Sequence, residues 1–288
     1  MECRIDLSYK IIKSMKKSTF LSLLLLAACS KKPLEDKTMS TDIKENIVLL
    51  QEDDIELSPP VVKIDSIFFN HSAKITMSAG DSQSIIKYNT DGLTNIVYKG
   101  PFEISNSSEI ETWIEKEGFK KSESKKYTVM KVPAIMADAE ITTDPISSET
   151  YPGNGVESLN DLKKGAFNFK EGNAWLGFKA EEVTIEVNFS KSIEADGVVI
   201  SFLSDPPSWI FEPQTISVYA DGNLLSRHVL DETRHDDESS MKIMPIQWGI
   251  KIGLKKLSIK IEQISEIPDW HVGSGSKPWM FIDEIFIQ

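Results

Sequence analysis

Apolar and polar residues follow the period of β-strands along the second half of the chain. Residues 183–189 and 257–261 alternate strictly between the two types, which is the pattern of strands buried on one face. Residues 198–203 form an apolar run, as in a core strand, and residues 214–220 lead into Asp221-Gly222, a pair typical of a hairpin turn. No long helical period accompanies these segments, so the pattern predicts an all-β protein.

Residues 58–132 have the same character on a smaller scale. Apolar and polar residues alternate at 75–79, and Thr90-Asp91-Gly92 is a strong turn signal because glycine adopts positive φ at little cost. Further short strands are expected at 84–88, 96–98, 102–104, 110–115 and 127–132. Short strands at regular spacing, separated by turns, predict a small antiparallel, immunoglobulin-like β-sandwich.

The end of the chain divides into a loop and a strand. Residues 268–278 are rich in Ser, Gly and Pro and have no period, whereas residues 279–287 alternate between two faces. A loop that carries Trp270 and His271 and leads into a terminal strand is typical of a recognition loop on a β-sandwich.

The N-terminal segment has the composition of an export signal. Lys16 and Lys17 precede the apolar run 20–28, which is too short to span a bilayer. The run ends in the letters LAAC at residues 26–29, which resemble the lipobox of bacterial lipoproteins. The resemblance implies that residues 1–28 are removed and that Cys29 is lipidated. An ordinary secretory signal that contains a cysteine is the alternative.

Lipidation of Cys29 would attach the protein to a membrane of the cell envelope, expected to be the outer membrane of a Gram-negative bacterium. Met15 would give a signal of normal length and is a second candidate for the start. Residues 29–57 mix charges with little period, which predicts a flexible tether. Cys3 lies in the removed part, so the exported chain has no disulfide to form.

The formal net charge of −12 limits the partners of the protein. Nucleic-acid binding requires clustered Lys and Arg, so an acidic chain argues against a nucleic-acid partner. None of the motifs G-x-S-x-G, H-E-x-x-H, C-x-x-C or a Walker loop is present. The acidic run His235 to Glu238 could suggest a metal, but consecutive side chains diverge, so a solvated loop is favoured.

Residues 86–104 and 111–129 carry a resemblance to a known module. Tyr88, the Thr90-Asp91-Gly92 turn, Tyr98 and Pro101 fit its pattern, as do Gly118 and Ser122. This part of the chain resembles the fibronectin-type-III-associated module that follows the catalytic domain of family 20 glycoside hydrolases. Asn95 stands near the place of the module's usual proline. The resemblance implies a spacer sandwich without chemistry of its own.

Three blocks, at residues 159–178, 198–222 and 267–285, resemble the discoidin (coagulation factor 5/8 type C) domain in the right order. The most similar form is the one appended to bacterial hexosaminidases, which is grouped with family 32 carbohydrate-binding modules. The resemblance implies an eight-stranded jelly roll over residues 156–288, after a linker at 133–155. Family 20 enzymes use a separate barrel for which this chain has no room, so we expect no enzymatic activity.

Tryptophan residues are the best candidates for binding. Sugars present apolar C–H faces and dense hydroxyls, so their sites combine an aromatic platform with polar groups. Trp270 is the preferred platform, with Asp269 and His271 as partners for hydroxyls. Trp209 fits a platform or a core position equally, whereas Trp175 and Trp279 adjoin apolar strand residues and are expected in the core.

Domains of the discoidin type often hold a structural Ca²⁺ through backbone carbonyls, an early acidic side chain and a Glu near the C-terminus. The resemblance places Asp161 and Glu284 at these positions. Oxygen ligands suit Ca²⁺, but Leu162 replaces the glycine that usually follows the Asp.

The sequence therefore predicts a lipid-anchored envelope protein whose jelly roll binds a glycan or polysaccharide, one that could contain N-acetylhexosamine. Two alternatives stay open. One is a module for protein binding, adhesion or assembly, and the other is a remnant of a hexosaminidase that has no ligand.

Overall fold

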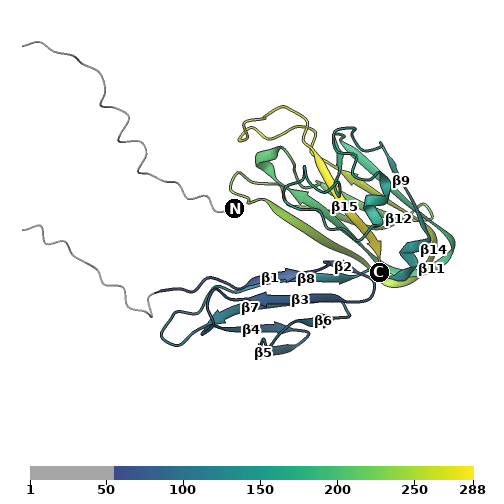
Figure 1. Cartoon of the computed structure of the whole chain (residues 1–288). Helices are drawn as coiled ribbons and strands as arrows, with labels where there is room; N and C mark the ends of the chain where they lie inside the picture. The colour runs from purple at the N-terminus through teal and green to yellow at the C-terminus, as the bar shows by residue number, and fades with distance from the viewer. Residues whose placement is uncertain (1–54) are drawn as a thin grey trace, which may run out of the picture. The chain divides into compact units, whose positions relative to one another are not determined.

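The structure is a computed structural model that describes residues 55–288 (Figure 1). Over this range the chain consists of fifteen strands with three short 3-10 helices, which confirms the predicted all-β class. The predicted signal peptide, Cys29 and all but the last residues of the predicted tether lie outside the described residues. Between residues 55 and 288, no helix is long and apolar enough to cross a membrane.

The first sandwich is built from two antiparallel sheets, apart from one parallel pair. Ile75, Ile110 and Val129 are fully buried in the core that the sheets share. One sheet has the order β1 (Val61–Ile64), β3 (Ala73–Ser78), β6 (Phe102–Ile104), and the other β2 (Phe68–Phe69), β8 (Lys125–Lys131), β7 (Ser108–Glu115), β4 (Ile85–Thr90), β5 (Leu93–Val97). All six strands expected in this half are present.

The predicted turns have the conformation that their residues favour. Asp91 and Gly92, between β4 and β5, have φ angles of 48° and 76°, and Asp221 and Gly222 have φ angles of 46° and 86°. Positive φ at both central positions is characteristic of type I′ hairpin turns. Both Asp-Gly pairs therefore set the register of a hairpin.

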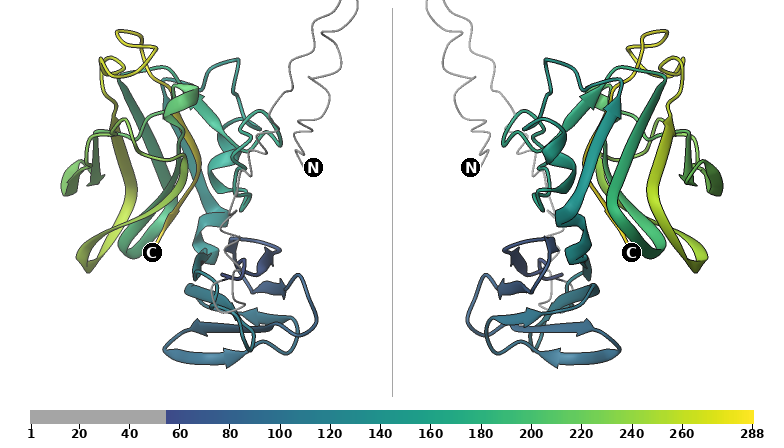
Figure 2. Two further views of the ribbon diagram at one scale, coloured as in Figure 1. Left: turned by 90° about the vertical axis from the view of Figure 1, so that its left-hand side faces the viewer. Right: turned by 90° about the vertical axis from the view of Figure 1, so that its right-hand side faces the viewer.

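The C-terminal sandwich contains seven strands, one fewer than the eight that the resemblance implied, and they appear in teal, green and yellow in Figures 1 and 2. They are β9 (Ala139–Asp144), β10 (Leu176–Phe178), β11 (Glu182–Ser204), β12 (Thr215–Ala220), β13 (Asn223–Val229), β14 (Ser240–Glu262) and β15 (Met280–Ile287).

The two longest strands connect both layers of this sandwich. β11 and β14 have 23 residues each and pair along nearly their whole length, with register shifts after Asn188 and Ala195. Residues 184–189 of β11 pair with β9, whereas residues 198–203 pair with β15. One layer is therefore β10-β15-β11-β14, and the other is β9-β11-β14-β12-β13.

Two details correct the sequence analysis. Residues 183–189 and 198–203 were expected as separate strands but belong to the single strand β11, because a bulge bends a strand without ending it. The predicted linker 133–155 contains β9, which pairs with β11, so the C-terminal sandwich begins before residue 156.

Candidate functional site

The loop before β15 is folded against the segment that follows β11. Within the loop, the backbone N–H of Ile267 donates to Ser276 O at 2.8 Å. Trp279 N donates to Trp209 O at 2.8 Å, and Phe211 N donates to Trp279 O at 3.1 Å. The predicted loop residues and Trp209, far apart in sequence, are thus brought together at one end of the sandwich.

His271 holds these two segments in place. Its Nε2 lies 2.9 Å from Pro206 O, and its Nδ1 accepts a hydrogen bond from Gly273 N at 2.9 Å. This pattern requires a proton on Nε2 and none on Nδ1. Both ring nitrogens are occupied by the backbone, so the geometry gives His271 a bracing role rather than a free polar group.

Trp209 is the second brace of the loop. It ends the 3-10 helix Pro206–Ser208 with a φ angle of 67°, and its indole covers Gly273 so closely that a Cβ at Gly273 would lie 2.8 Å from Trp209 Cε2. Glycine is therefore required at residue 273. The indole of Trp209 also lies edge-on to His271, with ring centroids 6.4 Å apart.

Trp270 is oriented toward solvent. Its side chain is 36% exposed, and its ring lies 6.0 Å from Phe211 and 5.8 Å from His235, centroid to centroid. It borders a cavity of about 270 Å³ whose apolar wall also includes Ile264 and Pro268. Neighbouring Asp269 is exposed and accepts a hydrogen bond from Ser274 Oγ at 3.0 Å.

Four carboxylates line the same cavity, and the sequence analysis did not assign them. They are Glu212, Asp231, Glu232 and Glu266. Glu212 forms an ion pair with Lys242 at 3.3 Å. A larger cavity of about 710 Å³ shares Glu212 and residues 230–233 with the first one.

The polar segment 231–240 had been expected as a solvated loop. It folds as a turn in which Arg234 N donates to Asp237 Oδ2 at 2.7 Å, and its side chains are mostly exposed. The edge of its His235 ring packs against Trp270, a contact for which the sequence offered no signal. The ligand-binding roles of Trp270, His271, Asp269 and Trp209 stay predictions.

The other two tryptophans of this region are core residues or nearly so. Trp175 is 2% exposed, and its Nε1 donates to Ala166 O at 2.9 Å. Trp279 is half-buried and packs at right angles to Tyr151, with ring centroids 5.1 Å apart.

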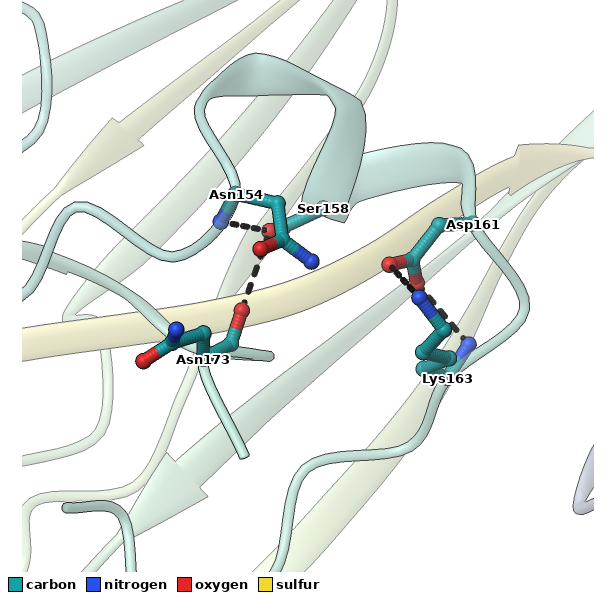
Figure 3. Close-up of polar contacts among 5 residues, drawn as sticks. All are labelled: Asn154, Ser158, Asp161, Lys163 and Asn173. Carbon is teal, nitrogen blue, oxygen red and sulfur yellow. Dashed lines mark hydrogen bonds and ion pairs between the residues drawn. The ribbon is translucent and has the colours of Figure 1, made fainter. Parts of the chain in front are cut away.

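The predicted metal residues lie where the first loop of the sandwich meets β15. Leu162 has a φ angle of 62°, so it adopts the conformation for which a glycine would be favoured. Asp161 accepts hydrogen bonds from Lys163 N at 3.0 Å and from Lys163 Nζ at 3.2 Å, as Figure 3 shows together with the contacts of Ser158. Its carboxylate therefore already has a cationic partner.

Glu284 and its neighbour Asp283 are buried side chains of β15, both 0% exposed. Ser201 of β11 pairs with Glu284 and Phe202 pairs with Ile282, so Asp283 is the extra residue of a β-bulge. A bulge breaks the strict alternation of a strand, which allows both carboxyl groups to face the loop that begins at Asp161.

The charges of this cluster are strongly affected by burial. Burial, and after it the Asp283 and Asp161 carboxyls, raises the pKa of Glu284 to about 9. Burial also raises the pKa of Asp283 and lowers the pKa of Lys164, whereas their mutual attraction opposes both shifts. At neutral pH the Glu284 carboxyl is accordingly a neutral acid.

The side chains of this cluster alone are too few to hold a Ca²⁺. The ion takes six to eight oxygen ligands, most of them from carboxylates and carbonyls. Within residues 55–288, no group of three or more His, Cys, Asp or Glu side chains is placed to hold a metal ion. Asp161 is paired with Lys163 and Oδ2 of Asp283 with Lys164, whereas Oδ1 of Asp283 and both Glu284 oxygens are buried without a hydrogen-bond partner.

Comparisons with known proteins were made for the whole chain. No family model and no curated protein matches the sequence. The family 32 carbohydrate-binding module of C. perfringens NanJ, solved with galactose, is 13% identical with a TM-score of 0.36, over 53% of this chain and 95% of that one. A SusE-like protein is 9% identical with a TM-score of 0.35, over 78% of this chain and 95% of that one.

A Ruminococcus gnavus GH29 fucosidase, solved with fucose, is 12% identical with a TM-score of 0.32, over 52% of this chain. The matched part spans 25% of the fucosidase. Identities and scores in this range support no conclusion about the ligand of this chain.

Proposed function

We propose that the C-terminal sandwich is a non-catalytic glycan-binding module and that the sugar lies against Trp270. The observation that carries this proposal is the indole of Trp270, which is 36% exposed on the wall of a cavity of about 270 Å³. That volume is near the lower end of the range for small-ligand sites, about 300 Å³ and above. It suits one or two sugar residues of a longer chain.

The cavity supplies the two kinds of surface that a sugar requires. Trp270, Ile264 and Pro268 provide apolar contact for C–H groups. Asp231, Glu232 and Glu266 provide carboxylate oxygens that accept hydrogen bonds from hydroxyls, whereas Glu212 is already paired with Lys242.

The other predicted ligand residues support this surface. His271 and Trp209 fix the loop backbone and thereby the direction of Trp270. Asp269 is exposed beside Trp270 and keeps one carboxylate oxygen outside its hydrogen bond to Ser274. We assign Asp269 to the rim of the site.

A glycan array with the purified protein tests the function. The array includes N-acetylhexosamine, galactose and fucose oligomers and envelope polysaccharides. The affinity for the best ligand is then measured by calorimetry, and Trp270→Ala is expected to weaken it about tenfold or more. Phe167→Ala, an aromatic residue that is 51% exposed on another loop, is the matched control and should leave the affinity unchanged.

Two results would count against glycan binding. If Trp270→Ala binds the glycan with the same affinity as the wild type, the sugar does not bind at Trp270. The alternative of a protein-binding module would be favoured by two observations together. No glycan on the array binds, and a protein co-purifies with the wild type but not with Trp270→Ala. Hydrolysis of a chromogenic N-acetylglucosaminide by the pure protein would contradict the absence of catalysis.

We also propose that Cys29 carries a lipid and anchors the protein in the envelope. The support is the sequence LAAC at residues 26–29 after a charged and apolar lead. Metabolic labelling with an alkyne fatty acid should mark the wild type, and Cys29→Ala should abolish the label. Membrane fractionation of the same strains then tests the outer membrane as the location.

A further inference from the structure

A buried lysine binds Asp283, the neighbour of Glu284, where the resemblance to discoidin domains implies a Ca²⁺ ligand. The side chain of Lys164 is 7% exposed, and its Nζ lies 2.7 Å from Oδ2 of Asp283, which is fully buried. The backbone N–H of Gly165 donates to the same oxygen at 2.7 Å. An ion pair with this degree of burial is maintained only when further contacts support it.

Trp175 supplies one of these contacts. The Lys164 ammonium lies 4.3 Å from the centroid of the Trp175 ring, a cation–π distance. The indole is itself held by its hydrogen bond to Ala166 O at 2.9 Å. The ammonium is therefore enclosed between an aromatic face and a carboxylate.

Gly165 makes the arrangement possible. A Cβ at this position would lie 2.2 Å from Trp175 Cε2, closer than any side chain tolerates. The absence of a side chain lets the loop backbone lie directly on the indole, which directs Lys164 inward. Its neighbour Lys163 points outward, with a side chain that is 63% exposed.

Two of the three carboxyl groups in this cluster have a lysine as their partner. The Asp283 carboxylate is matched by the Lys164 ammonium, and Asp161 by Lys163. A divalent cation bound to Asp283 would have to displace Lys164 and leave its ammonium buried without a partner, which is costly.

We propose that the ammonium of Lys164 is the resident cation of this site and replaces Ca²⁺, so that the C-terminal sandwich folds without divalent ions. In this arrangement the Lys164 ammonium takes the role of the metal ion, and Asp283 and the Trp175 ring take the role of its ligands. Gly165 allows the loop to pack closely enough for these contacts. The same arrangement implies that removal of the ammonium exposes the carboxyl groups of Asp283, Glu284 and Asp161 to external cations.

Thermal unfolding of the purified protein tests this directly. The melting temperature of the wild type should be the same in excess chelator and in millimolar Ca²⁺. A Ca²⁺ site filled at about 1,000 times its Kd would instead raise the melting temperature by several degrees. Such a shift, or stoichiometric Ca²⁺ binding by calorimetry, would overturn the proposal.

Variants separate the role of the ammonium from general damage. Lys164→Met keeps the length of the side chain and removes the charge, so we expect a melting temperature lower by about 10 °C or more and a new stabilisation by Ca²⁺. Adding Asp283→Asn removes the unpaired carboxylate and should restore part of the loss. Lys191→Met, at an exposed lysine for which the described residues show no ion pair, is the control and should change little.

The double variant keeps the test decisive if Lys164→Met alone fails to fold. A double variant that is no more stable than the single variant would show that Asp283 does not depend on Lys164, and the proposal would then be wrong. Stability of Lys164→Met equal to that of the wild type in chelator would have the same consequence.

Discussion

Two loops of the C-terminal sandwich each contain a tryptophan, and they use it in opposite ways. In loop 161–175, Trp175 is 2% exposed, its indole N–H is bonded to Ala166 O, and the Lys164 ammonium lies over its ring. In loop 268–278, Trp270 is 36% exposed and borders a cavity with carboxylates. One tryptophan stabilises the fold, and the other presents a surface.

The difference in exposure between Trp175 and Trp270 comes from the glycines of their loops. Gly165 lets the backbone of its own loop cover Trp175. In the other loop, Gly273 also allows an indole to pack on the backbone, but this indole belongs to Trp209. Trp270 is therefore left at the surface. In each loop, the indole that packs on the glycine is the one that becomes structural.

Substitution of the two tryptophans is the most direct test of this comparison, and Trp175 should give the largest effect. Trp175→Ala leaves a large cavity and removes the aromatic contact of Lys164, so the free energy of unfolding should fall by about 3–5 kcal/mol. Urea denaturation measures it. A loss similar to that of Trp270→Ala would show that the two loops do not differ in this way.

The second effect is a pH dependence that belongs to the buried cluster alone. Between its unfolded pKa of about 4.5 and its folded pKa of about 9, Glu284 holds a proton in the folded chain and has released it in the unfolded chain. Stability should therefore fall as pH rises through this window, by at most about 1.4 kcal/mol per pH unit.

Glu284→Gln provides the measurement for that dependence. Glutamine resembles the protonated acid in shape and does not titrate, so its denaturation midpoint should vary less with pH between 5 and 8 than that of the wild type. Glu238→Gln, in the exposed segment, should keep the slope of the wild type. Parallel curves for all three proteins would contradict a buried neutral Glu284.

A smaller effect is expected for the brace of the exposed loop. His271→Ala leaves Pro206 O and Gly273 N without their partner, which should lower the free energy of unfolding by about 1–3 kcal/mol. Asp269→Ala, at an exposed neighbour, serves as the control. If both variants are equally stable, His271 does not brace the loop, and a direct role toward ligand regains support.

The smallest effect on stability is expected for Trp270. Because its ring is partly in solvent, Trp270→Ala should change the free energy of unfolding by no more than about 1 kcal/mol while it weakens glycan binding. Denaturation and calorimetry on the same preparation check both. A large loss of stability would place Trp270 with Trp175 and end the contrast between the loops.

Local patterns anticipated the strands well because each depends on near neighbours. The Asp-Gly pairs at 91–92 and 221–222 form the expected turns, since glycine at positive φ needs no distant partner. The single strand β11 was divided in the sequence analysis because its bulges interrupt the alternation after Asn188. β9 was assigned to a linker because the strand with which it pairs, β11, lies about 40 residues further along the chain.

The candidate site was anticipated only in part. Trp270 stood out as an aromatic residue in a polar loop, but His235 and the carboxylates of residues 231–232 reach it from a distant segment. Lys164 was overlooked because a Lys-Lys pair resembles a solvated surface. A signal was present in β15, where Asp283 and Glu284 interrupt an apolar strand and require a buried partner.

The sequence by itself determined the all-β class, the two sandwiches, the hairpin turns and a tryptophan available to a ligand. These follow from period, turn chemistry and polarity, which act over a few residues. Only the tertiary structure decided which indole is covered, which backbone groups bind the two ring nitrogens of His271 and which cation meets Asp283. Burial and pairing are set by residues that are distant along the chain, and these determine the charge and exposure on which function depends.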